Sequence, residues 1–487
     1  MKLQNILDGF AVAVIVALVA PGAASCSFTA FGQQQEQASQ RDNEQQGNEQ
    51  GWLGIVVRNR QAQSAGTPVT PQFSADLLDS ANGLTADDLV RYALSHNGEL
   101  IAARQMIAEA RGRLRQAGLK ANPLIESNYQ HGITTTDNNT VVGAELPLEL
   151  GGRRNARVNV AQREIDVRTA EAADFERRLA AEVRTKYAEA IAAIRNLKFT
   201  EDLLVLTRDS YSLVEARVAR GKSAPLEQNV VLVEVNRTDA LRIGFESKST
   251  AAMFELKKAT GMPAEESLKL KGDFEVDRQP PPLNDLIRDA LTRRADLTAA
   301  RAAEELAKAQ IEQAQIEGKI DASIFANYMR QNMGFPVRGF DDSGALVPVQ
   351  DVFHYATFGV RLTLPVRNKN QGNIEAAQAL LEAARSRRGF GELLVRNEVT
   401  AAYARFQRAR AALTVYREGV RNQAQSNLEV IKQTYNLGQK SLLDYISEQR
   451  RFIDIETGYT EALKEYFESL VEVGRASGTA ANSGEER

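Results

Sequence analysis

Residues 353–364, FHYATFGVRLTL, alternate strictly between two kinds of side chain. An extended strand places alternate residues on opposite faces. One face of this strand is apolar throughout: Ala356, Phe358, Val360, Leu362 and Leu364. The other face is more polar: Tyr355, Thr357, Gly359, Arg361 and Thr363. Tilted strands of about 9–11 residues cross a bilayer, so this alternation predicts a membrane strand with lipid on one side and water on the other.

Three more segments predict strands, which gives two hairpins, at about residues 123–150 and 320–366. Residues 142–149 alternate in the same way, and residues 123–130 and 321–330 occupy matching places ahead of the hairpin loops. Four strands cannot close a barrel, and a bilayer does not tolerate open sheet edges. The strands therefore form a soluble sheet or combine between subunits. Eight strands from a dimer would be filled by side chains, whereas twelve from a trimer leave room for a channel.

A very long helix is predicted after the first hairpin. Residues 153–220 contain neither Gly nor Pro, and good helix formers dominate them. At 1.5 Å per residue such a helix is roughly 100 Å long, which implies packing of the coiled-coil kind. Its apolar seam steps by four and three residues: Val183, Tyr187, Ala190, Ile194 and Leu197. A cytoskeletal-type coiled coil would share the seam but not the strands.

The chain is internally duplicated, with repeats at residues 84–261 and 283–478. Identical residues recur at an offset of 197 where the repeats begin, as in Asp88 and Asp285. The duplication means that each hairpin and each long helix has a counterpart in the other repeat. The predicted fold is therefore mainly α-helical, with two strands in each repeat.

Both repeats have the same order of predicted elements. A helix (residues 85–120 or 284–319) precedes two strands, a very long helix, a glycine turn and a last helix. Beyond the hairpins the offset grows to 216, as between Glu182 and Glu398. About nineteen extra residues therefore lie in the second repeat. They fall around residues 331–350, whose Gly, Pro and Asp content predicts a longer loop.

The N-terminal region predicts export. Residues 1–25 combine a lysine, a short apolar run and small residues before a cleavage site, as in a signal peptide. The sole cysteine, Cys26, follows at once, in a bacterial lipobox-like context that predicts acylation; ordinary cleavage beside an incidental cysteine is the alternative. Residues 26–83 form a low-complexity segment with a glutamine-rich tract. Residues 479–487 are expected to be a flexible tail.

Composition and motifs disfavour several functions. The net charge of −3 offers no basic face for nucleic acid. One cysteine and three scattered histidines lack a zinc spacing, and no catalytic or nucleotide-binding motif is present, so we expect neither cofactor nor catalysis. Met329, Met333 and His354 flank the second hairpin and suggest a soft-metal site only weakly. A periplasmic coiled-coil adaptor or scaffold without its own pore remains an alternative.

The sequence resembles the TolC family of outer-membrane efflux proteins over roughly residues 84–478. Residues 435–450, YNLGQKSLLDYISEQR, are similar to the family's Tyr-x-x-Gly-x-x-Ser-x-x-Asp turn. The first repeat has RVARGKSAPLE at residues 217–227. Together with LELGGRR at residues 148–154, these turns look like the heavy-metal branch of the Czc and Cus type.

The resemblance implies a homotrimer in the outer membrane of a Gram-negative bacterium. Its twelve strands would share one β-barrel in the lipid, and its long helices would form an α-barrel through the periplasm. Such channels are passive exit ducts for metal ions or drugs. They work with a periplasmic membrane-fusion adaptor and an inner-membrane efflux pump, expected here to be of the RND type.

The helix turns at the far end of each repeat carry the candidate gate. Gly221 and Gly438 permit tight reversals, Ser441 can cap the returning helix, and an acid at 444 suits its first turn. That capping role is one interpretation of Asp444. The resemblance implies the other, a periplasmic gate whose residues are Tyr435, Lys440, Asp444 and Glu227. Three copies of Asp444 around one axis would attract cations.

Overall fold

The computed structural model describes residues 73–133, 135, 137–272 and 278–479. The predicted signal peptide, Cys26, the glutamine-rich tract and residues 480–487 lie outside this part of the chain. α1 (Phe73–Leu77) precedes the first repeat, within the segment predicted to be of low complexity. In the first repeat the elements are α2 (Ala86–His96), α3 (Gly98–Ala117), β1 (Leu124–His131), β2 (Asn138–Pro147), η1 (Leu150–Gly152), α4 (Arg153–Ala219) and α5 (Pro225–Thr260). In the second they are α6 (Leu283–Arg293), α7 (Ala295–Glu317), β3 (Asp321–Phe340), β4 (Leu346–Thr363), α8 (Gln371–Val415), η2 (Tyr416–Val420), α9 (Arg421–Asn436) and α10 (Leu442–Ser477).

The internal duplication is visible in equivalent contacts. Arg104 donates a hydrogen bond to the carbonyl of Leu94 (2.8 Å), and Arg301 donates to Leu291 in the same way (2.6 Å). Each last helix also ends in a glycine with positive φ, at positions 261 and 478. Each glycine lies against the junction between the short helices of its own repeat. The two repeats therefore fold alike in detail as well as in element order.

The opening helix of each repeat is broken where the sequence predicts one continuous helix. α2 ends before Asn97, whose side chain accepts hydrogen bonds from the backbone amides of Glu99 and Leu100 and so caps α3. Asn97 has ψ near 120°, which is not helical. Arg294 makes the equivalent break between α6 and α7, with ψ near 129°. The prediction of an unbroken helix was wrong. In the first repeat the side chain of Asn97 competes for the helical hydrogen bonds, whereas Arg294 makes no such cap and binds Asp296 and Glu398.

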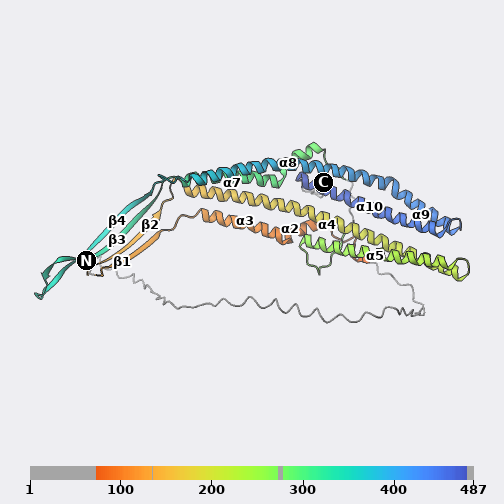
Figure 1. The fold of residues 1–487 in the computed structure, drawn as a ribbon, viewed down its shortest axis with the longest axis horizontal. Helices are drawn as coiled ribbons and strands as arrows, with labels where there is room; N and C mark the ends of the chain where they lie inside the picture. Colours follow the sequence, from red (N-terminus) through yellow and green to blue (C-terminus); the bar gives the residue numbers. More distant parts are fainter. Residues whose placement is uncertain (1–72, 134, 136, 273–277, 480–487) are drawn as a thin grey trace, which may run out of the picture. The chain divides into compact units, whose positions relative to one another are not determined.

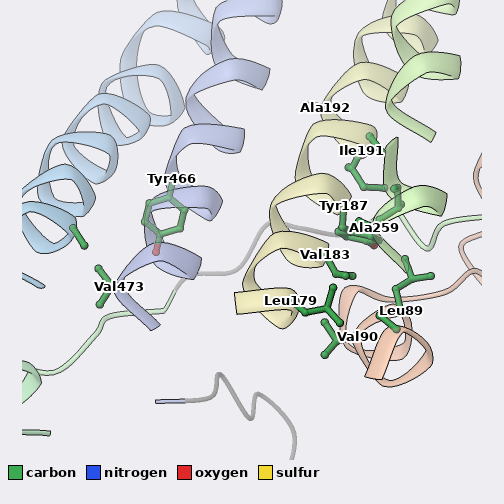
Figure 2. Close-up of a cluster of buried hydrophobic side chains, with 14 of the residues drawn as sticks. Leu89, Val90, Leu179, Val183, Tyr187, Ile191, Ala192, Ala259, Tyr466 and Val473 are labelled. Atoms are coloured by element: carbon green, nitrogen blue, oxygen red, sulfur yellow. The ribbon is translucent and has the colours of Figure 1, made fainter. Parts of the chain in front are cut away.

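The long helix α4 is continuous and supplies the main core. Its predicted seam is buried: Val183, Tyr187, Ala190, Ile194 and Leu197. Figure 2 shows Val183 and Tyr187 of α4 beside Leu89 of α2 and Ala259 of α5, while Tyr466 and Val473 of α10 lie in the same cluster of buried residues. None of the described helices is both long enough and apolar enough to span a membrane.

The long helix of the second repeat contains an irregular turn. Residues 416–420 form a π-helical turn between α8 and α9, whereas α4 has no such interruption. The hydroxyl of Tyr416 lies 2.6 Å from where a Cβ at Gly458 would be, so the ring packs over this glycine of α10. The extra residue in the turn thus coincides with close contact between the two helices.

The strands form one antiparallel sheet in the order β1-β2-β3-β4. β1 pairs with β2 through residues 124–131, and the pairing of β2 with β3 stops at Asn332. β3 and β4 continue past that point as a two-stranded ribbon (Figure 1). The extra residues of the second repeat are therefore strand and not the predicted loop, with a turn only at residues 341–345. Backbone pairing satisfies groups that a loop would leave to water.

Candidate functional site

The sheet has one apolar and one polar face. Residues directly opposite each other in the ladder share a face, as do alternate residues along a strand. The apolar residues of this face are Ile125, Val142, Ala144, Leu146, Ile324, Ala326, Tyr328, Ala356, Phe358, Val360 and Leu362. Ser127 lies among them, and Thr140, Arg330 and His354 occupy the same face farther from the helices. Its apolar side chains are strongly exposed, to 79% for Ile125 and 80% for Phe358. An apolar patch of this extent is a contact surface, and lipid is the contact that a membrane provides.

The polar face is less exposed in the central strands and carries a hydrogen-bonded network. Ser323 donates to the carboxylate of Glu145 (2.5 Å), and Arg361 donates to the same carboxylate. The guanidinium of Arg361 also lies over the ring of Phe325, 5.5 Å from its centroid. These contacts tie β2, β3 and β4 together near the helices. The polar face is thus suited to contact with water.

The suggested soft-metal site is not assembled. Met329 lies opposite Tyr355, and Met333 lies opposite Asp351, so both methionines share the polar face. His354 lies opposite Arg330, on the apolar face. The three side chains therefore point to opposite sides of the sheet. Within the described ranges, no group of three or more His, Cys, Asp or Glu residues is arranged to hold a metal ion.

The two helix turns at the end of the helical part that lies away from the sheet have the predicted geometry. Gly221 and Gly438 have φ of 69° and 74°, in the left-handed region that favours glycine. Each lets the chain reverse within a few residues, from α4 into α5 and from α9 into α10. We call these turns and the adjoining helix ends the tip. Leu226, Leu437 and Leu443 are strongly exposed there.

Asp444 caps the helix that follows its turn. The hydroxyl of Ser441 accepts a hydrogen bond from the backbone amide of Asp444 (3.2 Å), and the Asp444 carboxylate accepts from the amide and hydroxyl of Ser441 (3.1 and 2.9 Å). This reciprocal arrangement is a capping box. The hydrogen bonds from Ser441 lower the pKa of Asp444, with a smaller contribution from the charge of Lys440. The carboxylate is therefore held ionised and exposed.

Tyr435 lies between the two turns. Its ring stacks on that of Tyr445 with 5.8 Å between centroids, and the guanidinium of Arg217 in the first repeat lies 5.7 Å from its centroid. Burial raises the pKa of the Tyr435 hydroxyl, the charge of Arg217 opposes this and the charge of Glu227 adds to it. The hydroxyl is buried without a hydrogen-bond partner among the described residues. The ring of Tyr435 thus joins the α4–α5 helical hairpin to the α9–α10 helical hairpin.

The other two predicted gate residues, Glu227 and Lys440, make fewer contacts. Glu227 is half-buried in the first turn of α5, where its charge acts on Tyr435. Lys440 is exposed in the second turn, just ahead of α10. The structure therefore places Glu227 near enough for its charge to act on Tyr435 across the repeats, and it places Lys440 near enough to act on Asp444.

Further contacts at the tip were missed by the sequence analysis. Arg450 of α10 binds Glu234 of α5 at 2.6 Å, and Gln449 donates to the hydroxyl of Thr207 in α4 at 3.0 Å. An apolar cluster joins the same helices: Val214, Val231, Leu442, Tyr445 and Ile446. Arg450 and Gln449 lie inside the motif that carries the resemblance. Their partners lie in the other repeat, and sequence spacing gives no signal that pairs them.

Comparison with known proteins fits this architecture. A model of the outer membrane efflux protein family matches residues 89–262 and 286–479, one segment in each repeat. The cobalt-zinc-cadmium resistance protein CzcC of Cupriavidus metallidurans is 22% identical over 414 residues, which are 85% of this chain and 94% of that protein.

Solved structures share the fold. A crystal structure of CusC, studied for its folding and transmembrane channel formation, matches with a TM-score of 0.64 at 18% identity, covering 86% of this chain and 99% of that one. The open state of the MtrE outer membrane channel of Neisseria gonorrhoeae matches with a TM-score of 0.63 at 18% identity, covering 85% and 93%. These likenesses do not favour the coiled-coil adaptor. Because the family model spans both repeats, this chain belongs to the outer membrane efflux protein family.

Proposed function

We propose that three copies of this chain form one continuous exit duct through the outer membrane and into the periplasm. This proposal rests on one observation. In a single chain, both edges of the sheet and both edges of the helical layer are available for contact with another copy. In the sheet, β1 and β4 are the edge strands. In the helical part, contacts run in the order α3-α4-α7-α8, so α3 and α8 are the flanks.

The open flanks have apolar side chains that water alone would not favour. On α3 these are Ile101 and Met106, and on α8 they are Leu380, Phe390, Leu393 and Leu394, all exposed. Since the two flanks differ, contact between copies would be head-to-tail, which produces a closed ring when the rotation closes. Three copies give twelve strands, enough for a barrel with a water-filled interior. The apolar face of the sheet would then meet lipid and the polar face would line the lumen.

The proposed partners are a periplasmic adaptor and an inner-membrane pump of the RND type, because a passive duct needs an energy source elsewhere. The exposed leucines of the tip suit an apolar contact with the adaptor. The similarity to CzcC, a cobalt-zinc-cadmium resistance protein by name, favours divalent metal ions as cargo over drugs. Loss of this gene should then lower tolerance to cobalt, zinc or cadmium and leave drug tolerance unchanged.

We also propose that the tip is the gate, with Tyr435, Lys440, Asp444 and Glu227 as its residues. Lys440 is exposed, and the Tyr435 hydroxyl has no partner in the described structure of a single chain. The Lys440 ammonium therefore has hydrogen bonds to offer a neighbouring copy, whereas the Tyr435 hydroxyl is buried inside its own chain and can bridge only helices of that chain. Three Asp444 carboxylates around the same opening would favour cations as they enter.

Mass measurement in mild detergent tests the assembly. The parent protein should have the mass of three chains. Replacing Ile101 and Met106 by Glu should split the trimer, because it places charges in the proposed interface. Ile133, which is 99% exposed beside the β1–β2 turn, provides the control: Ile133→Glu should leave the trimer intact. A stable monomer of the parent protein would overturn the proposal.

A further inference from the structure

We propose that the polar face of the sheet ends, on the side away from the helices, in a hydrophobic collar that narrows the outer mouth of the duct. The collar consists of Met329, Met333, Phe335, Phe353 and Tyr355. It would form a second barrier, separate from the tip, that slows large or strongly hydrated solutes. The inference rests on the proposed trimer, because the collar encloses an opening only when three copies surround it.

The ladder places these side chains on the polar face. Met329 is opposite Tyr355, and Phe353 lies two residues before Tyr355 on β4, so these three share a face with Thr357. Met333 lies four residues beyond Met329 on β3 and has the same orientation. The two phenylalanine rings meet edge to face with 6.3 Å between centroids, and Phe353 stacks on Tyr355 at 6.4 Å. The aromatic row therefore extends from the sheet into the ribbon.

The chemistry of the polar face changes along the strands. Near the helices most of its residues are small or polar, and Leu124 and Phe325 are the large apolar exceptions. The small or polar residues are Glu126, Gly143, Glu145, Ser323, Asn327, Thr357, Gly359 and Arg361. At the collar, β3 and β4 present thioether and aromatic groups. Gln331 and Asp351 on these strands, and Asn128, Gln130 and Asn139 on β1 and β2, also lie on this face. Tyr355 is 43% exposed and Phe335 is 37% exposed. These rings face away from the lipid side, so lipid does not explain their exposure.

The dimensions make a constriction reasonable. At the level of Met329, Phe353 and Tyr355, all four strands of each chain pair. Twelve strands about 4.8 Å apart and tilted by about 40° there give a circumference near 75 Å and a backbone diameter of roughly 24 Å. Met333 and Phe335 lie beyond this ring, in the two-stranded ribbon. Phenylalanine, tyrosine and methionine side chains reach about 6 Å from the backbone by ordinary bond lengths. Side chains from opposite walls therefore leave a passage of roughly 12 Å. The bulky thioether and aromatic groups raise the cost of passage for hydrated solutes, since they narrow the opening and return fewer hydrogen bonds than the polar residues that share these levels.

The two methionines do not turn the collar into a metal site. Four residues along a strand span about 13–14 Å, so Met329 and Met333 of one copy are too far apart to share one ion. The collar would restrict passage through its bulky, mostly apolar side chains and not through metal binding.

Thiol labelling on intact cells tests the collar independently of the tip. Asn327→Cys places a thiol on the polar face, on the helix side of the collar. A small maleimide added from outside should label it readily, and a maleimide carrying a rigid group of about 15 Å should label it slowly. Changing Phe353 and Tyr355 to Thr should speed the bulky reaction at least fivefold. Threonine is chosen because it retains β-propensity.

The matched control changes Phe340 and Leu346 to Thr. These residues are opposite each other near the end of the ribbon. Leu346 has the alternation of the apolar face, as Phe358 does. This control should leave the rate of labelling by the bulky maleimide unchanged. The protein that retains Asn327 gives the background labelling.

Each result is decisive. Equal bulky labelling in parent, collar variant and control, with the trimer mass intact, would overturn the collar but leave the proposed function standing. A parent without a trimer would overturn both. If the double variant does not fold, Tyr355→Thr alone should still speed bulky labelling at least twofold, and an unchanged rate there would also overturn the collar.

Discussion

Arg450 and Glu234 bind each other across the two hairpins of the tip, with 2.6 Å between the guanidinium and the carboxylate. Glu234 is almost fully buried, and its next partner, Arg237 of the same helix, is 3.5 Å away. Because a buried carboxylate is costly without a cation, this pair favours the packed arrangement of α5 against α10. It is the tip contact that depends most directly on the two repeats staying together.

Arg450→Ala should loosen the tip. The change leaves the Glu234 carboxylate with Arg237 alone, and we expect a loss of about 1–3 kcal/mol, since a charged hydrogen bond is removed from a partly exposed pair. Circular dichroism during heating should show a lower unfolding midpoint. Single-channel recording in planar bilayers should show a larger conductance. Arg450→Lys retains the charge and should lie between the parent and Arg450→Ala. Equal conductance in all three would mean that the pair does not restrain the opening.

Two changes at Asp444 separate its capping role from its charge. Asp444→Asn retains an acceptor oxygen for Ser441 and removes the charge, whereas Asp444→Ala removes both. Both should weaken cation over anion selectivity, measured as reversal potential in a salt gradient. Only Asp444→Ala should also lower the thermal midpoint, because it removes the acceptor that closes the capping box with Ser441. Unchanged selectivity in both variants would leave Asp444 with the cap alone.

The same carboxylate sets a pH dependence. The pKa of Asp444 in the folded chain is lowered by hydrogen bonds from Ser441, so its stabilising effect is complete above the ordinary carboxyl pKa and is lost as the pH falls through the lowered value. Cation selectivity should therefore be constant from pH 8 to pH 5 and decline only below about pH 4. A decline already at pH 5–6 would mean that the three carboxylates lie close enough to raise one another's pKa.

Tyr435→Phe combined with Lys440→Ser should loosen the closed state of the gate. The double change removes a hydroxyl and an ammonium that we propose to bridge neighbouring helices, while Phe retains the stacking on Tyr445. Higher conductance with an unchanged thermal midpoint is the expected result. Lys432→Ser, at an exposed position in α9, serves as the control for loss of one positive charge. Parent-like conductance in the double variant would place the gate elsewhere.

The glycine turns should respond differently from a glycine inside a helix. Gly221→Ala and Gly438→Ala force a Cβ into the left-handed region, which costs about 1 kcal/mol or more. No described neighbour lies within 4 Å of either added Cβ, so the cost is conformational and not steric. Gly244, inside α5 and equally uncrowded, is the control, and Gly244→Ala should stabilise by about 0.5–1 kcal/mol. Urea titration of the purified protein measures all three, and opposite signs are expected.

Cys26 should carry the lipid anchor. Cells fed a radioactive fatty acid should label the parent protein, and Cys26→Ala should abolish the label because no other cysteine is present. The variant should still insert, because the apolar face of the sheet buries far more area than acyl chains do. Thr29→Ser, which lies beyond the cleavage site, leaves both the thiol and the lipobox in place and tests whether label loss is specific. Label that persists in Cys26→Ala would remove the lipoprotein prediction.

Local patterns in the sequence were sufficient to predict the strands, the long helix, the helix cap and the glycine turns. The alternation in residues 353–364 depends only on the two-residue period of a strand, and the seam of α4 only on the helical period, so both could be read without knowing what they contact. The Ser441 cap and the turns at Gly221 and Gly438 are equally local. The ribbon was missed because Gly and Pro usually indicate a loop, whereas here β3 and β4 pair past them through a register shift between Gly334 and Arg338.

The sequence by itself determined the duplication, the helical rods, the strand faces and the tip turns, because each arises from periods and caps within a few residues. Only the tertiary structure decided which side chains meet across the repeats. The Arg450–Glu234 pair joins positions 216 residues apart, and Tyr435 meets Arg217 only when the two hairpins pack side by side. The separation of Met329 and Met333 from His354 also required the strand register, since a shift of one residue would reverse the faces.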